Sequence, residues 1–121
     1  MKQIKNFNSY EVQIRQVRKI VAHMGCSVAN GDVQIRDLYV LPKNRGKGLG
    51  EVLLAKSVDY AVDKKARRII AFCGAEPFCE GGQIPLEQEV SWYKDHGFFH
   101  DHDVMGATPC MIRELTQEVV Q

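Results

Sequence analysis

The sequence lacks the features that cross membranes, staple small folds or attract polyanions. Its longest apolar runs are only a few residues, and the opening stretch MKQIKNFNSY has no apolar core, so we expect neither a membrane-spanning helix nor a signal peptide. Its four cysteines include no CxxC pair, so we expect reduced thiols packed as small core residues in the cytoplasm. The 16 basic and 15 acidic residues nearly balance, which excludes a global attraction to nucleic acid.

The composition predicts one folded domain over residues 1–121. A chain of 121 residues with 45% hydrophobic residues is long enough to bury a core without disulfides or a structural metal. The sequence has no internal repeat and no low-complexity tract, so nothing in it suggests a repeat array or a linker.

The apolar periodicity predicts a mixture of strands and helices. Pro42 ends an apolar run because proline has no amide hydrogen to donate, and Gly97 follows a helical pattern at the position where glycine commonly ends helices. We predict strands at 12–17, 33–41 and 67–73, helices at 49–65 and 87–96, an antiparallel strand pair at 98–104 and 110–115, and either a strand or a helical turn at 20–28. A strand, helix and strand over 33–73 form a parallel, right-handed unit, so the fold class is α/β (α+β).

A glycine-rich basic loop joins the strand at 33–41 to the helix that follows. Gly46, Gly48 and Gly50 let an anion approach the backbone closely, while Arg45 and Lys47 add positive charge beside the start of a helix. The loop is not a P-loop, because no GK[ST] follows, and its glycine spacing does not fit the dinucleotide fingerprint. The loop is either a phosphate-binding site or a flexible surface turn.

Two motifs in order give a specific resemblance. The run LYVLPKNRGKGLGEVLLAKSVDYA carries R-x-x-G-x-G at Arg45, Gly48 and Gly50, and WYKDHGF carries Y-x-x-x-G-F from Tyr93. Over residues 33–104 the chain resembles the GNAT superfamily of N-acetyltransferases, whereas residues 1–32 are short of that family's usual first strand and two helices. The resemblance implies a mixed central sheet with a strand-loop-helix acetyl-CoA motif and a shortened amino-terminal region.

The resemblance also implies a cosubstrate and a set of site residues. Acetyl-CoA would pair its pantetheine arm with the backbone of Leu38 and Val40, and the amide of Val40 would polarise the thioester carbonyl. Tyr93 matches the family's general acid, which protonates the departing thiolate; its alternative role is an ordinary helix aromatic packed on the sheet. The pyrophosphate would be held by the loop residues Arg45, Gly46, Lys47, Gly48, Leu49 and Gly50.

The acceptor side has no obvious general base. Counting back from Arg45 with a period of two places Gln34 and Arg36 on the substrate-facing side of the strand and Asp37 on the other side. Neither Gln34 nor Arg36 is a base at neutral pH, although Arg36 could bind a carboxylate or phosphate of the acceptor. The alternatives are a water wire, an amine that arrives deprotonated, or an acidic residue downstream: Glu76, Glu80 or Glu87.

The second motif departs from the family pattern at its amino-terminal end. Leu86 stands where many members have an asparagine that contacts the cofactor, and Glu89 stands where a small residue is expected. The connection from Gly74 to Pro85 is longer than usual, so it either closes over the acceptor or is only an insertion.

Charge is distributed unevenly along the chain. Residues 43–68 carry eight basic and three acidic side chains, whereas residues 74–103 carry one basic and seven acidic side chains. This split suits an anionic cofactor on one side and a cationic amine on the other, or it is simply two solvated faces of opposite sign. His100 and His102 could share a strand face, but exposed solubilising residues are commoner there, so we predict no metal site.

The sequence therefore favours an N-acetyltransferase that moves the acetyl group of acetyl-CoA to a primary amine, of a protein or a small molecule, by direct transfer in a ternary complex. The alternative is a non-catalytic CoA-binding or interaction module with this fold, because the base is missing and the amino-terminal region is short. A nucleic-acid-binding domain is a weaker alternative, because the basic residues lack interleaved aromatics. A homodimer would complete the short amino-terminal region.

Overall fold

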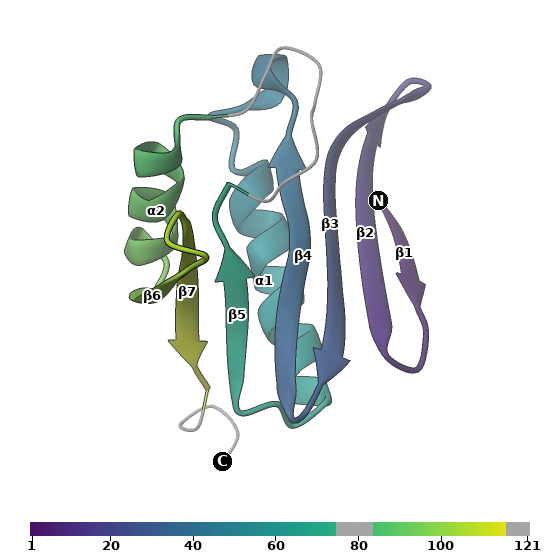
Figure 1. The fold of residues 1–121 in the computed structure, drawn as a ribbon. Helices are drawn as coiled ribbons and strands as arrows, with labels where there is room; N and C mark the ends of the chain where they lie inside the picture. The colour runs from purple at the N-terminus through teal and green to yellow at the C-terminus, as the bar shows by residue number, and fades with distance from the viewer. Residues whose placement is uncertain (75–83, 116–121) are drawn as a thin grey trace.

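The protein is built on one mixed sheet with its helices packed against it (Figure 1). The computed structural model describes residues 1–74 and 84–115. The seven strands lie in the order β1-β2-β3-β4-β5-β7-β6. The strands are β1 (Lys2–Lys5), β2 (Ser9–Gln16), β3 (Lys19–Ala29), β4 (Asp32–Val40), β5 (Arg68–Phe72), β6 (Phe99–Val104) and β7 (Thr108–Glu114). The helices are a short 3-10 turn at Pro42–Asn44, α1 (Leu49–Asp63) and α2 (Leu86–Asp95).

The predicted strand, helix and strand are confirmed. β4 and β5 pair in parallel and α1 connects them, so the glycine-rich loop lies at the carboxyl end of β4. The terminal strands β6 and β7 are antiparallel, as expected. The α+β class and the mixed central sheet that the resemblance implies are therefore confirmed.

The amino-terminal region holds more strand than the sequence indicated. Residues 20–28 are part of the long strand β3, not a helical turn, and β1 was not predicted. Small residues in β3, such as Ala22 and Gly25, are buried and weaken the apolar alternation that marks a strand. β1 reads KQIK and is mostly exposed, so it gives almost no hydrophobic signal.

One face of the sheet carries the main core. Side chains of α1 and α2, among them Leu53 and Tyr93, share a single buried cluster with Met24, Ile35 and Met111 of the strands. Both helices therefore pack on the same face of the sheet. Within the described residues, no helix is both long and apolar enough to cross a membrane.

The cysteines that the structure describes behave as core residues. Cys26, Cys73 and Cys110 are all buried, and Cys79 lies outside the described residues. Burial raises the pKa of the Cys26 thiol to about 12, so this group is a neutral, unreactive thiol at physiological pH.

A β-bulge in β4 corrects the face predicted for Asp37. Gly25 pairs with Asp37 and Cys26 pairs with Ile35, so Arg36 is an extra residue in β4. Cross-strand partners point to the same face, and Ser27, two residues beyond Gly25, pairs with Gln34. Asp37 therefore shares a face with Gln34, and the count by a period of two was wrong because the bulge shifts the alternation by one residue.

Candidate functional site

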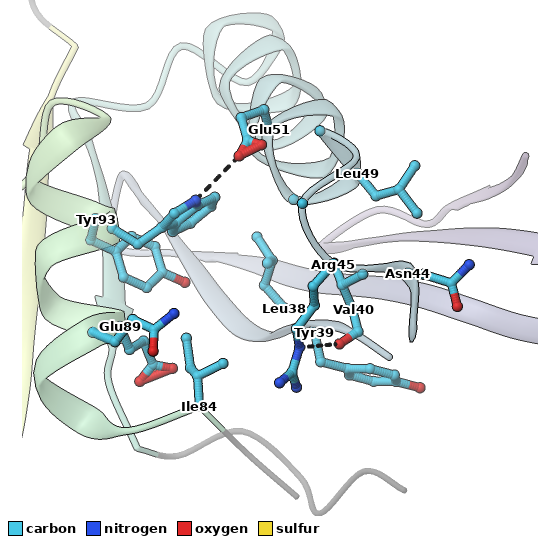
Figure 2. A pocket seen from close by; sticks show the side chains of 15 residues that line it. Leu38, Tyr39, Val40, Asn44, Arg45, Leu49, Glu51, Ile84, Glu89 and Tyr93 are labelled. Carbon is cyan, nitrogen blue, oxygen red and sulfur yellow. Dashed lines mark hydrogen bonds between the residues drawn. The ribbon is translucent and has the colours of Figure 1, made fainter. Parts of the chain in front are cut away.

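A cavity of about 290 Å³ lies where β4 ends and α1 begins (Figure 2). The volume is at the lower end of the range for small-molecule sites in proteins. It is lined by Leu38, Tyr39, Val40, Asn44, Arg45, Gly46, Gly48, Leu49, Gly50, Glu51, Ile84, Gln88, Glu89, Trp92 and Tyr93. β4, the glycine-rich loop, α1 and α2 thus all contribute walls.

The first wall is the edge of β4. In the described part of the chain, the parallel pairing of β4 with β5 extends only from Asp32 to Ile35. The amide of Leu41 donates to the carbonyl of Val21 on β3 at 2.9 Å. Successive residues of a strand direct their amides to opposite sides. The amides of Leu38 and Val40 therefore point away from β3, toward the edge of β4 that no longer pairs with β5 in the described residues. The strand therefore presents backbone donors to the cavity.

The second wall is the glycine-rich loop and the start of α1. Gly48 is the N-cap of α1 with φ of 80°, and no side chain of the described residues caps this helix end. The amides of the first helical turn are therefore available to an anion, and the helix dipole adds to their attraction. Arg45 donates from Nε to the carbonyl oxygen of Val40 at 2.9 Å, which holds the loop against the end of β4.

The third wall is the face of α2. Tyr93 is 2% exposed, and its hydroxyl points into the cavity toward Leu38 (Figure 2). The indole of Trp92 donates to a carboxylate oxygen of Glu51 at 3.3 Å, which links α2 to the first turn of α1. A side chain at Gly50 would begin 3.2 Å from the Trp92 ring, so this glycine also allows the close approach of the two helices.

Glu89 fills the place where the family pattern has a small residue. It is only 7% exposed, points into the cavity one helical turn before Tyr93, and accepts a hydrogen bond from the amide of Gly74 at 2.6 Å (Figure 2). This contact ties α2 to the end of β5. Leu86, at the first position of α2, is 41% exposed and does not line the cavity.

Glu89 makes a testable contribution to stability. Changing Glu89→Ala leaves the amide of Gly74 without its acceptor, so we expect the free energy of unfolding to fall by about 1–3 kcal/mol. Glu89→Gln keeps an acceptor oxygen and should lose less. Urea unfolding of both variants measures the difference, and equal stability of Glu89→Ala and wild type would contradict this role.

The structure brings most, but not all, of the sequence-predicted residues to the cavity. Seven of the predicted cofactor residues line it, together with Tyr93, whereas Lys47 is exposed and lies outside it. Those seven are Leu38, Val40, Arg45, Gly46, Gly48, Leu49 and Gly50. Gln34 and Arg36 lie on the opposite face of the sheet and do not line it. Of the suggested bases, Glu87 is exposed on α2, and Glu76 and Glu80 lie outside the described residues, as does most of the Gly74–Pro85 connection.

Sequence reasoning missed several cavity residues. Glu89 was placed in the second motif but was not expected to line the cavity, and Gln88 was not singled out. Both stand one helical turn before Trp92 and Tyr93, so the helical period from the tyrosine could have identified them as lining residues. Tyr39 had no such signal, because its position depends on the bulge in β4.

Comparison with known proteins agrees with the resemblance described in the sequence analysis. The family model described as the Acetyltransferase (GNAT) family matches residues 5–79, well over half of the chain. The match begins nearer the amino terminus than the motifs alone indicated and ends before the Tyr93 motif. No curated protein matches the chain.

Solved structures share the fold. PaiA N-acetyltransferase of Thermoplasma acidophilum, solved with coenzyme A, has a TM-score of 0.70 at 14% identity over 88% of this chain and 61% of its own. An acetyltransferase of Bacillus cereus has a TM-score of 0.68 at 19% identity, covering 88% and 73%. The ribosomal-protein-S18-alanine N-acetyltransferase of Escherichia coli has a TM-score of 0.67 at 15% identity, covering 91% and 71%. With the family match and the fold in agreement, the chain belongs to the GNAT family of acetyltransferases.

Proposed function

We propose that this chain transfers an acetyl group from acetyl-CoA to a primary amine by direct transfer in a ternary complex. The observation that carries the proposal is the cavity itself, which joins three features in one space. These are the backbone donors of β4, the uncapped start of α1 and the hydroxyl of Tyr93. Each feature serves a different part of an acyl thioester of a pyrophosphate-containing carrier.

The amino-terminal end of α1 suits the pyrophosphate. Amides from Gly46 to Gly50 would donate to its oxygens, and Arg45 adds a positive charge. Beyond Ile35, the edge of β4 on the β5 side pairs with no strand of the described residues and suits the pantetheine arm, because an extended ligand with amide groups can pair with a strand edge. The amides of Leu38 and Val40 would donate to it, and that of Val40 would polarise the thioester carbonyl.

The reaction then needs one proton moved onto sulfur. The amine nitrogen attacks the thioester carbon, the new C–N bond forms and the C–S bond breaks. Tyr93 would give its hydroxyl proton to the departing sulfur, since its hydroxyl points toward the strand that would hold the thioester. Burial of Tyr93 keeps bulk water from competing for this position.

A turnover assay tests the proposal. The protein is incubated with acetyl-CoA and a panel of small amines and amino-terminal peptides, and release of the CoA thiol is followed. We expect amine-dependent thiol release. Binding of acetyl-CoA without release for any amine would favour the alternative, a non-catalytic CoA-binding module.

The thiols are consistent with a reducing compartment. Cys26 and Cys110 are buried free cysteines, and burial raises the pKa of both. Reduced cysteines are usual in the cytoplasm, which is where we place this activity.

A further inference from the structure

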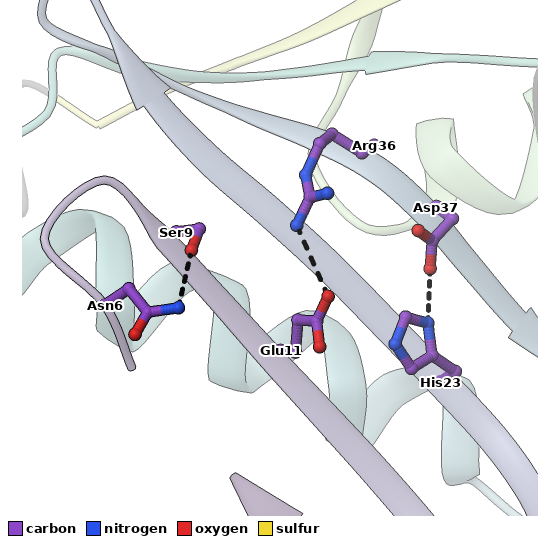
Figure 3. Close-up of polar contacts among 6 residues, drawn as sticks. All are labelled: Asn6, Ser9, Glu11, His23, Arg36 and Asp37. Carbon is purple, nitrogen blue, oxygen red and sulfur yellow. Dashed lines mark hydrogen bonds and ion pairs between the residues drawn. The ribbon is translucent and has the colours of Figure 1, made fainter. Parts of the chain in front are cut away.

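A cluster of charged side chains lies on the sheet face opposite α1 (Figure 3). Nδ1 of His23 on β3 lies 2.5 Å from Oδ1 of Asp37 on β4. Beside this pair, the guanidinium of Arg36 lies 3.8 Å from a carboxylate oxygen of Glu11 on β2. The His23 and Asp37 side chains are only 16% and 19% exposed, so the surrounding strands hold the pair in a fixed position.

The hydrogen bond with Asp37 determines which nitrogen of the His23 ring carries the proton. An ionised carboxylate only accepts hydrogen bonds, so the proton of the neutral ring lies on Nδ1, between His23 and Asp37. Nε2 is then left as a proton acceptor. A histidine held in this tautomer by a carboxylate is suited to general-base chemistry.

Two residues of β4 next to the pair also line the cavity, Leu38 and Tyr39. Asp37 directly precedes Leu38, which lines the cavity from the other face of β4. The ring of His23 lies 5.7 Å from the ring of Tyr39, another cavity residue. β4 leaves β5 just before this point, after Ile35, so the sheet opens next to the pair.

Gly25 makes room for the cluster on β3. A Cβ at this position would stand 3.1 Å from Oδ2 of Asp37 and 3.2 Å from a terminal nitrogen of Arg36. Both contacts are tighter than usual for a Cβ, so a side chain here would press on both groups. The bulge in β4 and the glycine opposite it together bring these side chains over the strand.

We propose that His23, oriented by Asp37, accepts the proton that the acceptor nitrogen loses during acetyl transfer, with the acceptor arriving from the sheet face opposite α1. The inference rests on the function proposed above. As the C–N bond forms and the C–S bond breaks, Nε2 of His23 takes one proton from nitrogen and Tyr93 gives one to sulfur. The products are an amide and a thiol, and both side chains then exchange protons with solvent.

The charges around His23 define the pH dependence. The hydrogen bond with Asp37 is the largest influence and raises the pKa of His23, the charges of Asp37 and Glu11 raise it further, and burial and Arg36 lower it. The net effect is a pKa above 6.5. Tyr39 also faces the ring, with the two ring centroids 5.7 Å apart. Since only the neutral ring accepts a proton, kcat/KM for the amine should rise with pH through a value above 6.5.

The same cluster favours a cationic acceptor. Glu11 and Asp37 bring two carboxylates against the single guanidinium of Arg36 while His23 is neutral. An ammonium group would therefore be attracted to this position, where it gives one proton to solvent to become the neutral amine and the second to His23 as the C–N bond forms.

The test compares His23→Gln with His100→Gln. His100 is an exposed histidine on β6 that also bonds an aspartate, with Nε2 2.7 Å from Oδ1 of Asp103, so it is a matched control. We expect His23→Gln to lower kcat/KM for the amine by about 100-fold or more and to remove the acid limb of its pH profile. The Kd for acetyl-CoA should stay unchanged, which also shows that the fold is kept. His100→Gln should match wild type.

Asp37→Asn provides a second measurement on a positioning residue. It keeps the size of the side chain and an acceptor oxygen but removes the charge, so the acid limb should move to lower pH. Two results would overturn this inference alone. One is wild-type turnover in His23→Gln with an unchanged acid limb of the pH profile of kcat/KM. The other is an acid limb that moves to higher pH in Asp37→Asn. A wild-type protein that binds acetyl-CoA and acetylates no amine would overturn the proposed function as well.

Discussion

Replacing the hydroxyl of Tyr93 should slow acetyl transfer by about 100- to 10,000-fold without weakening acetyl-CoA binding. Tyr93→Phe keeps the ring that packs edge-on against Phe98 at 5.0 Å, so the fold should survive. The change removes the hydroxyl that would donate the proton to the departing sulfur. Steady-state kinetics by thiol release should show a fall in kcat, while calorimetry should show an unchanged Kd for acetyl-CoA.

Tyr60→Phe is the matched control for this change. Tyr60 is a buried tyrosine of α1 whose ring stacks on Tyr10 at 4.9 Å, and its hydroxyl has no hydrogen-bond partner among the described residues. Removing that hydroxyl should leave turnover unchanged. If Tyr93→Phe also turned over at the wild-type rate, Tyr93 would be a packing residue and not the general acid.

A side chain at Gly48 should weaken acetyl-CoA binding by about 100-fold or more. The residue has φ of +80°, a region that β-branched residues rarely adopt, and it stands where the pyrophosphate would approach the backbone. Gly48→Val distorts the loop and covers the first amides of α1. Loss of two charge-assisted hydrogen bonds at about 1.5–3 kcal/mol each is enough for the expected change. Calorimetric titration measures the Kd directly.

Gly106→Val is the control that distinguishes the effect of backbone strain from the effect of blocking the binding site. Gly106 has φ of +76° and, like Gly48, no described atom within 4 Å of an added Cβ, but it lies in the turn between β6 and β7. It should lose similar stability and bind acetyl-CoA like wild type. If Gly48→Val and Gly106→Val bound acetyl-CoA with the same Kd, the pyrophosphate would not bind at the start of α1.

The parts of the fold that the sequence predicted are those with a strong periodic signal and clear ends. Pro42 and the glycines after it mark the end of β4 and the start of α1, and Gly97 marks the end of α2. β1 and the full length of β3 were missed, because a polar edge strand and a strand with small buried residues show little apolar alternation.

The candidate site likewise contains residues that could be predicted from the sequence and residues that could not. The glycine-rich loop follows from local sequence, and the family resemblance added Leu38 and Val40, so most of the expected cavity lining could be predicted. The His23–Asp37 pair that we propose for the acceptor side could not be predicted, because it depends on the one-residue bulge at Arg36 and on the pairing of His23 with a residue in another strand. No period within a single segment encodes either feature.

Calorimetric titration of the wild-type protein with acetyl-CoA, CoA and a nicotinamide dinucleotide shows directly whether the protein binds acetyl-CoA. Unfolding temperatures in the presence of the same ligands give a second measure of binding. We expect acetyl-CoA and CoA to bind saturably and the dinucleotide not to bind. At 100 times its Kd, acetyl-CoA should add about 2.7 kcal/mol to the free energy of unfolding, a shift that is easily measured in a protein of this size. Absence of binding to all three, or equal binding of the dinucleotide, would contradict the assignment of the cavity to acetyl-CoA and leave only the family fold.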